Sequence, residues 1–594
     1  MSLVPIIAGF PSSNRVPGAV GEVLFGTAGQ GAAGLPLLLL VVGLKLAAGT
    51  ITPDTQVQPI GSQADADLYA GAGGEGACML YDAIKIAGPA GVPIFYASPT
   101  PAGGATAATA GILVGGTWTV GGQITIRIGG VSVPVTVGAT DSVTTVAANL
   151  AAAIAGYNGG RLPVTGTSSV GQLTLASRTS GVRGMQHVVF LDMSQAPSGL
   201  TAVWGTTWVT ATTTAAATPF WVPSAAHTNG FYYKLTTVGS PATTSTEPTW
   251  PTTIGMATTA DSNGNIWTCW GTLPTSSNNV LAATLGDASG LETYTALLNT
   301  IANSQYNRIA LASNDATSLA AWKAQVDLVA AAPTDLLQHY VAASNGTLAA
   351  AISLAQTTCN DQRGQFVWAL NCETHPSRIA AATAAQRALS EQQDPDAAYN
   401  NYPLSTVAPQ SQQADWPLNA TLVSALNNGV TPMTTQRGDG FMRIVRSITS
   451  HSLSGSNPDY STFDTGQASV PDFVLTDWRL YYLTNLGPNN PRVQDNPNVA
   501  AGEKNPPSGV LYPNLCIAAF TRKLVDYSNG VLAPSSGQAP NSGAAATTPP
   551  IVDVPQAGDV QAVFDPSAKR IIVTANVRVK ANDAQLGISI RQAA

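Results

Sequence analysis

Apolar and polar positions alternate along residues 441–448, and this period of two predicts a β-strand. Its inward face would carry Met442, Ile444 and Ile448. Residues 450–469 are polar and rich in Gly, Ser, Asn and Asp, so a long loop is expected after the strand. Thr476 and Asp477 then offer an N-cap for a helix, because apolar residues recur at helical spacing as far as Leu486.

From residue 281 onward, short apolar strands alternate with helical segments. Strands are predicted at residues 308–311, 337–342 and 366–370. The helices that follow them are expected to be capped by Asn314, to be capped by Asn345 and to begin after Pro376. A strand–helix repeat of about 30 residues is typical of a parallel sheet with right-handed crossovers.

The chain before this repeat predicts two different pieces. Residues 35–46 predict a buried strand, and helices at 65–70 and 77–86 precede a strand at 93–96. Further along, a β-β-α-β-β unit is predicted from strands at 124–128, 131–137, 173–175 and 188–190 around an Ala-rich helix capped by Asp141 and Ser142. This unit is expected to be an insertion into the rest of the fold.

Residues 200–275 are rich in Thr and in aromatic side chains. Six of the eleven tryptophans lie here: Trp204, Trp208, Trp221, Trp250, Trp267 and Trp270. One interpretation is a sugar-stacking platform, since flat rings match the apolar face of a pyranose. The rings that would contact a surface glycan are Trp221, Tyr232, Trp250 and Trp267. The other interpretation, which we favour, is that the rings form the core of a small β domain. Asp261 begins a calcium-like loop that lacks the closing Glu, so a turn is expected there.

The composition of the chain favours some classes of function and argues against others. Charged residues make up 10% of the 594 positions, against about 25% in a typical globular protein. A surface so poor in charge suits a subunit that copies of itself cover. The net charge of −7 argues against nucleic acid as the main partner. Half of the 26 Lys and Arg residues nevertheless fall between Arg437 and Arg591, so one face of the last domain is expected to be cationic.

Cysteines and apolar runs indicate neither a disulfide framework nor a membrane anchor. The five cysteines are odd in number and show no C-x-x-C spacing, so buried thiols are expected. The apolar run of residues 35–42 is too short to span a bilayer. It also lacks the basic flank and the position of a secretory signal. The chain is therefore expected to stay in the cytoplasm where it is made, with no membrane partner.

No set of residues predicts catalysis or a cofactor. The five histidines lack the sequence context of a Ser-His-Asp triad, and no G-x-S-x-G element is present. Residues 71–76 match G-x-G-x-x-G, but they follow a helical segment rather than a strand, which argues against nucleotide binding. We expect no catalytic residues, no metal and no cofactor. Two acids converging in a glycosidase cleft are not excluded by sequence.

The stretch from Gly438 to Leu486 carries a resemblance to a known family. It contains a D-G turn, a strand with spaced arginines, a polar loop, V-P-D and W-R-L-Y-Y. This order resembles the C-terminal domain of contractile phage tail sheath proteins of the Mu-like family. The insertion is also similar to the one in that family, in its R-I-G-G-V-S-V turn and T-L-A-S-R strand. The resemblance covers about residues 1–195 and 281–594, and residues 200–275 depart from it.

The resemblance implies an α/β multidomain fold. It comprises a sheath core with a βαβ, subtilisin-like but non-catalytic domain, a C-terminal α+β domain and inserted β-rich domains. The expected divisions are an N-terminal arm at 1–34, a first part of the core at 35–110, an inserted α+β domain at 111–199, an extra Trp/Thr-rich β domain at 200–275, the βαβ domain at 276–420 and a C-terminal domain with its arm at 421–594.

The same resemblance implies a structural role without enzymatic activity. Sheath subunits stack as hexameric rings in a helix around a tail tube, and contraction drives the tube through a host envelope. The implied partners are further copies, the tube protein, and the baseplate and terminator proteins, in a virion tail assembled in the host cytoplasm. Intersubunit arms would include Ser2, Leu3, Val4, Ile6, Ile7, Phe10, Gly587, Ile588, Ile590 and Arg591. Charge facing the tube is expected at Arg443, Arg446, Arg479, Arg522 and Lys523, with the last two exposed.

Two alternatives stay open at this point. A sugar-binding tail protein or adhesin would use the Trp-rich segment, and a degenerate hydrolase would use the βαβ domain. The five cations could equally lie in solvent or pair within their own domain.

Overall fold

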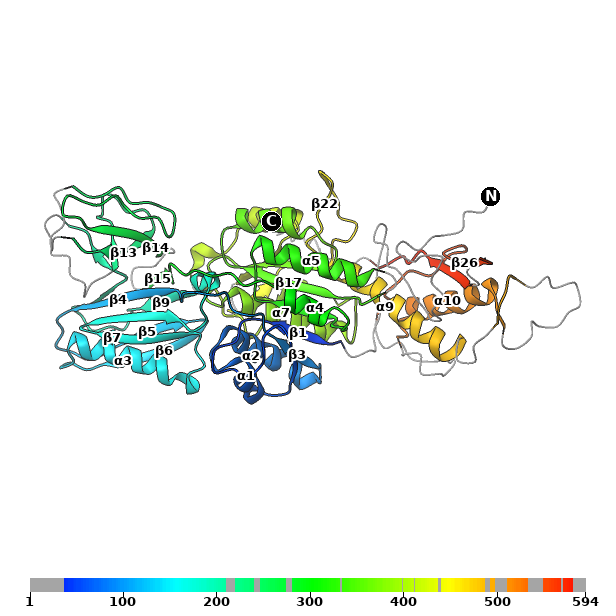
Figure 1. Ribbon diagram of the computed structural model, residues 1–594, viewed down its shortest axis with the longest axis horizontal. Coiled ribbons are helices and arrows are strands. Elements are labelled where there is room, and N and C mark those ends of the chain that lie inside the picture. The colour runs from blue at the N-terminus through cyan, green and yellow to red at the C-terminus, as the bar shows by residue number, and fades with distance from the viewer. Residues whose placement is uncertain are drawn as a thin grey trace, which may run out of the picture.

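The computed structural model describes most of the chain and leaves out its two ends. The described residues are 37–209, 220–239, 246–273, 280–331, 334–397, 399–410, 412–435, 440–486, 492–496, 510–532, 549–567 and 570–580. Both predicted arms lie outside these residues, as do Gly438 and Asp439 of the predicted turn. The described units form a row along the longest axis of the molecule (Figure 1).

A nine-stranded sheet forms the centre of the molecule, in the order β19-β21-β20-β18-β17-β16-β1-β3-β2. Its strands are β1 (Leu39–Val42), β2 (Val57–Ile60), β3 (Ile94–Ala97), β16 (Arg308–Leu311), β17 (His339–Ser344), β18 (Gly364–Trp368), β19 (Tyr402–Pro403), β20 (Thr431–Thr435) and β21 (Met442–Ile444). The run from β3 to β20 is parallel, β2 and β21 pair antiparallel with its two edges, and β19 pairs antiparallel with β21. The predicted parallel βαβ sheet is present, with Met442, Ile444 and Ile448 buried as expected.

Helices cover both faces of this sheet because its strands are apolar on both faces. In β1, Leu39 and Val41 pack toward one set of helices, while Leu40 and Val42 pack toward the other. The first face carries α1 (Gln63–Ala70), α2 (Glu75–Ala87) and α7 (Pro376–Glu391). The second carries α4 (Thr295–Ile301), α5 (Ala316–Ala330), α6 (Leu348–Leu354) and α8 (Asn419–Asn427). Strands β20 and β21 belong to this sheet, so the division expected at residue 421 falls inside one unit.

The insertion follows β3 and consists of two four-stranded sheets, β10-β4-β8-β7 and β15-β9-β5-β6, with α3 (Val143–Gly156). The strands are β4 (Thr109–Gly116), β5 (Gly122–Ile128), β6 (Val131–Val137), β7 (Val164–Ser169), β8 (Gln172–Ser177), β9 (Val188–Asp192), β10 (Leu200–Val203) and β15 (Val280–Thr284). Because β10 pairs with β4 and β15 with β9, the Trp-rich segment is itself inserted within this unit. The domain expected to begin at residue 200 therefore takes in β10, which belongs to the insertion.

The Trp-rich segment forms a four-stranded sheet of β11 (Thr206–Thr207), β12 (Phe220–Val222), β13 (Phe231–Thr237) and β14 (Ile266–Thr272). The four rings predicted to contact glycan are all buried: Trp221, Tyr232 and Trp267 have no exposed surface, and Trp250 is 7% exposed. Trp221 and Trp250 both pack edge-on against Trp267. The glycan prediction is thus wrong for these rings, since burying large aromatics is what stabilises so small a sheet. Asp261 closes a turn by accepting hydrogen bonds from the backbone N–H groups of Asn263 and Asn265, at 2.9 and 2.8 Å.

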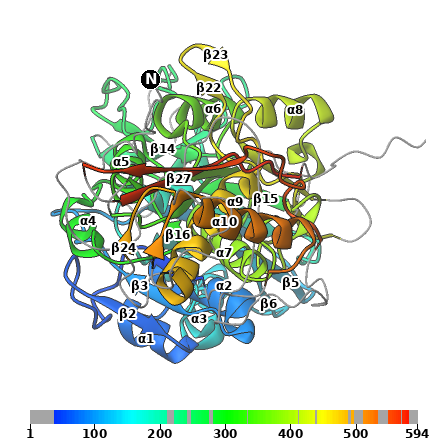
Figure 2. The same cartoon turned by 90° about the vertical axis from the view of Figure 1, so that its right-hand side faces the viewer.

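The C-terminal unit packs α9 (Thr465–Tyr481) against α10 (Pro513–Ser528) and a hairpin of β26 (Val560–Asp565) and β27 (Arg570–Ala575) (Figure 2). Two short pairs, β22 (Leu453–Ser454) with β23 (Asn457–Pro458) and β24 (Arg492–Val493) with β25 (Val510–Leu511), lie in the connecting chain. The stacked rings of Trp478 and Phe520, 4.5 Å apart, join the two helices.

Helix α9 begins earlier than predicted. Asp464 and Gln467 form a capping box at its start, and this reciprocal pair of hydrogen bonds satisfies the free N–H groups there. Thr476 and Asp477 consequently lie inside the helix, so their predicted role as an N-cap is wrong. Pro471 also lies within the helix.

The Trp-rich sheet is held against the insertion by hydrogen bonds to two backbone carbonyls and by a ring that packs on Gly111. The hydroxyl of Tyr232 donates to the carbonyl of Thr284 at 2.8 Å, and the indole N–H of Trp270 donates to that of Thr109 at 2.9 Å. A Cβ at Gly111 would come within 2.2 Å of the Phe220 ring.

We therefore expect Gly111→Ala to loosen this contact by about 1–3 kcal/mol, because the ring must move to admit a methyl group. Hydrogen exchange of residues 220–235 should become faster. Gly156→Ala is the matched control, since a Cβ there meets nothing within 4 Å. Equal exchange rates in the two variants would contradict the prediction.

Candidate functional site: the buried ionic junctions

The parallel strands of the central sheet have a different unit at each end. At their amino ends, Arg308 begins β16 and His339 begins β17, and both contact side chains of α9 or its neighbours. At their carboxyl ends, Asn314 and Asn345 follow the same two strands and bond to Gln186 of the insertion, at 2.8 and 3.0 Å. Two buried polar junctions therefore lie at opposite ends of the sheet.

These two asparagines had been predicted to cap helices. Asp315 caps α5 and Thr347 caps α6 instead, because the asparagine amides are engaged with the insertion.

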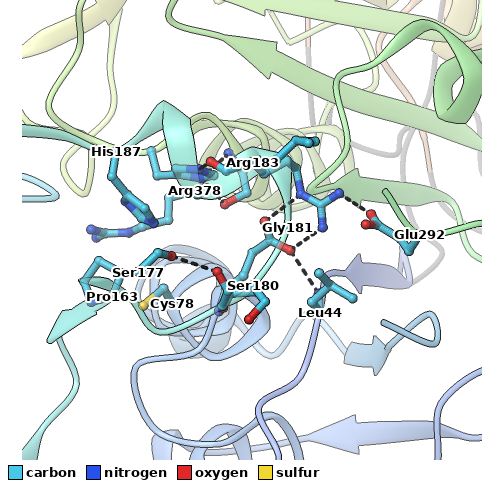
Figure 3. Close-up of a pocket in the computed structure, with 16 residues that line it drawn as sticks. Leu44, Cys78, Pro163, Ser177, Ser180, Gly181, Arg183, His187, Glu292 and Arg378 are labelled. Carbon is cyan, nitrogen blue, oxygen red and sulfur yellow. Dashed lines mark hydrogen bonds and ion pairs between the residues drawn. The ribbon is translucent and has the colours of Figure 1, made fainter. Parts of the chain in front are cut away.

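The insertion junction centres on Arg183, which lies in a short 3-10 turn (Val182–Gln186). Its guanidinium forms two hydrogen bonds of 2.7 Å to Glu75, in the first turn of α2, and also pairs with Glu292 (Figure 3). Glu75 accepts a further bond from the backbone N–H of Leu44 at 3.0 Å, and the Tyr294 hydroxyl donates to Glu292 at 2.6 Å. Burial raises the pKa of Glu75, but the charge and hydrogen bonds of Arg183, together with smaller contributions that include the Leu44 N–H, hold that pKa below its usual value. The pair thus stays ionised.

This pairing also explains the glycine-rich match at residues 71–76. Glu75 is its one charged member and faces Arg183, while a Cβ at Gly76 would lie 2.4 Å from the Tyr96 hydroxyl. The glycines therefore allow α2 to approach β3 closely. Arg378, in the first turn of α7, adds a second tie by binding Asp82 at 2.7 and 3.0 Å and the carbonyl of Gly129 at 2.7 Å.

Two histidines complete the insertion junction. The His375 side chain is the N-cap of α7, and its ring lies 4.4 Å from that of His187. Burial lowers the pKa of both imidazoles, most strongly for His187. The cavity beside them has a volume of about 20 Å³, close to that needed for a single water molecule. A small-molecule site is usually more than ten times larger, so this cavity does not fit a substrate.

The C-terminal junction is built on Glu391, the last residue of α7. Its carboxylate accepts hydrogen bonds from Arg308 at 2.8 Å, from Arg387 at 2.6 Å and from the Ser469 hydroxyl of α9 at 2.9 Å. Burial raises the pKa of Glu391, but the two arginines outweigh burial and lower it to about 2. The charge is therefore present throughout the physiological range.

One turn further along α9, Asp472 accepts hydrogen bonds from Arg363 at 2.8 Å and from His339 at 2.9 Å. Burial, followed by the charge of Arg308, lowers the pKa of His339 to about 3. His339 is thus neutral and donates its N–H to the carboxylate. The face of α9 toward the sheet is polar, which explains why its apolar pattern did not predict this contact.

The five cations predicted to face a tube mostly have partners inside the chain. Arg446 pairs with Asp464 at 2.7 Å, Arg479 with Asp335 at 3.5 Å, and Lys523 with Asp477 at 2.6 Å. Arg443 donates to the carbonyl of Asn401 at 2.7 Å. Lys523 is only 6% exposed, so its predicted exposure is wrong: its neighbour one position earlier on α10, Arg522, takes the outward face. Whether any of the five contacts a tube stays a prediction.

The described residues give little evidence for a disulfide, a metal site or a membrane span. All five cysteines are free and buried, as predicted, and burial raises the pKa of Cys269 to about 11. The described ranges hold no cluster of three or more His, Cys, Asp or Glu side chains arranged to bind a metal. No described helix has both the length and the apolar character to cross a bilayer.

Comparisons with known proteins gave matches among solved structures alone. No family model matches the sequence, and no curated protein matches it either. Among solved structures, the sheath tail protein DSY3957 of Desulfitobacterium hafniense matches 95% of this chain and 96% of its own, with a TM-score of 0.40 and 13% identity.

Two further solved structures match. The sheath tail protein Lin1278 of Listeria innocua covers 93% of each chain, with a TM-score of 0.42 and 10% identity. A chain in the baseplate structure of the anti-feeding prophage covers 52% of this chain and 76% of its own, with a TM-score of 0.32 and 11% identity.

We expect Glu391→Gln to destabilise the protein by about 3–5 kcal/mol, because it leaves two buried guanidinium groups without an anion. Urea unfolding followed by tryptophan fluorescence measures the change. Asp327→Asn is the control: Asp327 lies on the surface, 4.0 Å from Lys323, and such pairs contribute at most about 1 kcal/mol. A Glu391 variant as stable as this control would contradict a structural role for the junction.

Proposed function

We propose that the chain is a structural, non-enzymatic tail sheath subunit that polymerises helically around a tail tube and contracts to drive the tube through a host envelope. The observation that carries this proposal is the hairpin at the C-terminal end of the molecule. Among the described strands, β26 and β27 pair only with each other, so each has an outer edge. A two-stranded sheet is marginal alone and gains stability from added strands.

The strands to be added come from neighbouring copies. Residues 2–10 and 587–591 contain alternating or clustered apolar side chains, and each segment is long enough to form a strand. Addition of a β-strand requires only an extended segment and a free strand edge. One hairpin has two such edges, which matches the two segments that each copy supplies. Backbone hydrogen bonds would then link every subunit to its neighbours.

Rigid units and a surface poor in charged residues also suit a sheath subunit. The buried ion pairs hold the units of one subunit in fixed register, while the chain has few charges left to resist close packing of copies. In contraction, intact subunits re-pack into a lattice of lower energy while the strand links persist. The energy is stored at assembly, and no cofactor is consumed.

The partners that follow from this proposal are further copies of the chain, the tube protein, and the baseplate and terminator proteins. The assembly would form in the cytoplasm of a host cell and function in a virion tail. No observation on the described residues now favours the sugar-binding alternative, since the rings proposed for it are core residues.

Deleting residues 2–10, or separately residues 587–591, should abolish the formation of tubular polymers, because each deletion removes one of the added strands. Negative-stain electron microscopy of the purified protein measures this directly. Circular dichroism should show the secondary structure of the intact subunit in both cases.

A deletion of equal length within residues 533–548 is the control, since this low-complexity stretch supplies no predicted strand. Tubes that form equally well without either terminal segment would refute the strand-exchange part of the proposal.

Arg522 gives a test of tube contact that leaves the fold intact. Its neighbour Lys523 is buried against Asp477, so reversing that charge would unfold the unit, whereas Arg522 lies on the exposed face of α10. We expect Arg522→Glu to weaken assembly on tubes more at low salt than at high salt. Arg492→Glu, another exposed arginine of the C-terminal unit, is the matched control. Equal assembly of both variants would place the tube contact elsewhere.

A further inference from the structure

The histidine pair at the insertion junction has a hydrogen-bond arrangement that only neutral rings can make. Nδ1 of His375 accepts from the backbone N–H of Ser377 at 3.3 Å and from the Ser377 hydroxyl at 2.7 Å. Its Nε2 N–H donates to the carbonyl of Arg183, in the insertion, at 3.0 Å. One imidazole thus caps helix α7 and binds the neighbouring unit at the same time.

A proton on Nδ1 would break this arrangement. A charged imidazole has two N–H donors and no acceptor, so it cannot accept from the backbone N–H of Ser377. The hydroxyl of Ser377 can turn to accept instead, but the backbone N–H cannot. A positive charge at the N-terminus of α7 also opposes the helix dipole.

Glu75 is the carboxylate that favours a charge on His375, but burial outweighs its effect and the pKa of His375 is lowered. The carboxylates nearby are already bound: Glu75 and Glu292 by Arg183, and Asp82 by Arg378. The titratable and charged groups around the pair are Glu75, Cys78 and Asp82 on α2, Arg183 in the insertion, Glu292 and Tyr294 before and at the start of α4, and Arg378 on α7. His187, the other ring, adds a second charge 4.4 Å away once it is protonated.

We propose that His187 and His375 form a proton-operated latch that holds the insertion, and the Trp-rich sheet that it carries, against the central sheet. The latch is closed when both rings are neutral. Protonation of His375 removes the cap of α7, and protonation of His187 as well places two like charges 4.4 Å apart, so the contact between the insertion and the central sheet loosens although the ion pairs remain. The latch does not depend on the sheath role.

The direction of the pH dependence follows from the burial of the rings. Both have a pKa below the usual histidine value in the folded protein, so the open state binds protons more readily than the closed one. The latch is therefore closed above about pH 6.5 and opens progressively as the pH falls below that value. Burial also lowers the pKa of His339, to about 3, but this ring lies at the C-terminal junction and bonds to Asp472, so its protonation acts on a different contact.

Hydrogen exchange of the full chain between pH 7.5 and 4.5, corrected for the intrinsic effect of pH, tests the latch. In the wild type, protection of residues 182–187 and 376–380 should fall at least about tenfold, the change that one pKa unit of differential proton binding produces. The double variant His187→Phe with His375→Asn should keep its protection, since Asn caps helices without titrating. His227→Gln, which replaces an exposed histidine of the Trp-rich sheet, should behave as the wild type.

Three outcomes would overturn the latch: constant protection in the wild type, the same loss in the double variant, or loss spread evenly over the central sheet. Should the double variant fail to fold, the single variant His187→Gln serves, because it keeps the His375 cap. It should move the opening to lower pH, and an unmoved profile would refute the coupling between the two rings.

Discussion

Buried arginine–carboxylate pairs are the constraint on which the rest of this structure depends. Arg183 is held between Glu75 and Glu292, and Glu391 is held between Arg308 and Arg387. Each set joins segments that lie far apart in the chain, and each is almost fully enclosed. A buried charge that loses its partner raises the free energy of the folded protein by several kcal/mol, about 3–5. These units therefore pack in the one register in which each of these charges has its partner.

The position of the pairs follows from the parallel sheet. All parallel strands start at one end and finish at the other, so a single sheet presents two separate sets of strand termini. The amino ends receive the polar face of α9, and the carboxyl ends receive the Arg183 turn of the insertion. The central sheet thus lies between two attached units, and the buried charges Glu75, Arg308 and Glu391 lie at those attachments.

A surface poor in charged residues and an interior held by buried ion pairs are complementary properties for a subunit of a polymer. Contacts between copies can form over uncharged surfaces and change without separating strong ion pairs, while contacts within each copy resist the same forces. The hairpin β26–β27 is different from both, because among the described strands these two pair only with each other, and unpaired strand edges can bind a further strand. The histidine pair adds a place where the interior itself responds to its surroundings.

The local pattern of the sequence determined the elements of this fold. The strand–helix repeat predicted the parallel sheet, and the alternation around Ile444 predicted which side chains face inward, since these features depend on neighbours two to four positions away. The burial of the aromatic rings agrees with the prediction that the Trp-rich segment forms the core of a small β domain. It does not agree with the alternative that these rings contact a glycan. The start of α9 was misplaced because a capping box outside the apolar pattern set it.

Only the tertiary structure decided the junctions. Arg183 and Glu75 are 108 positions apart, and Arg363 and Asp472 are 109 apart, so neither pair has a signal in any local window. In sequence, an arginine at the start of an apolar strand such as Arg308 could have indicated a buried partner, but not which one. Electrostatic pairing depends on distance in space and on exclusion of water, and both exist only once the chain has folded.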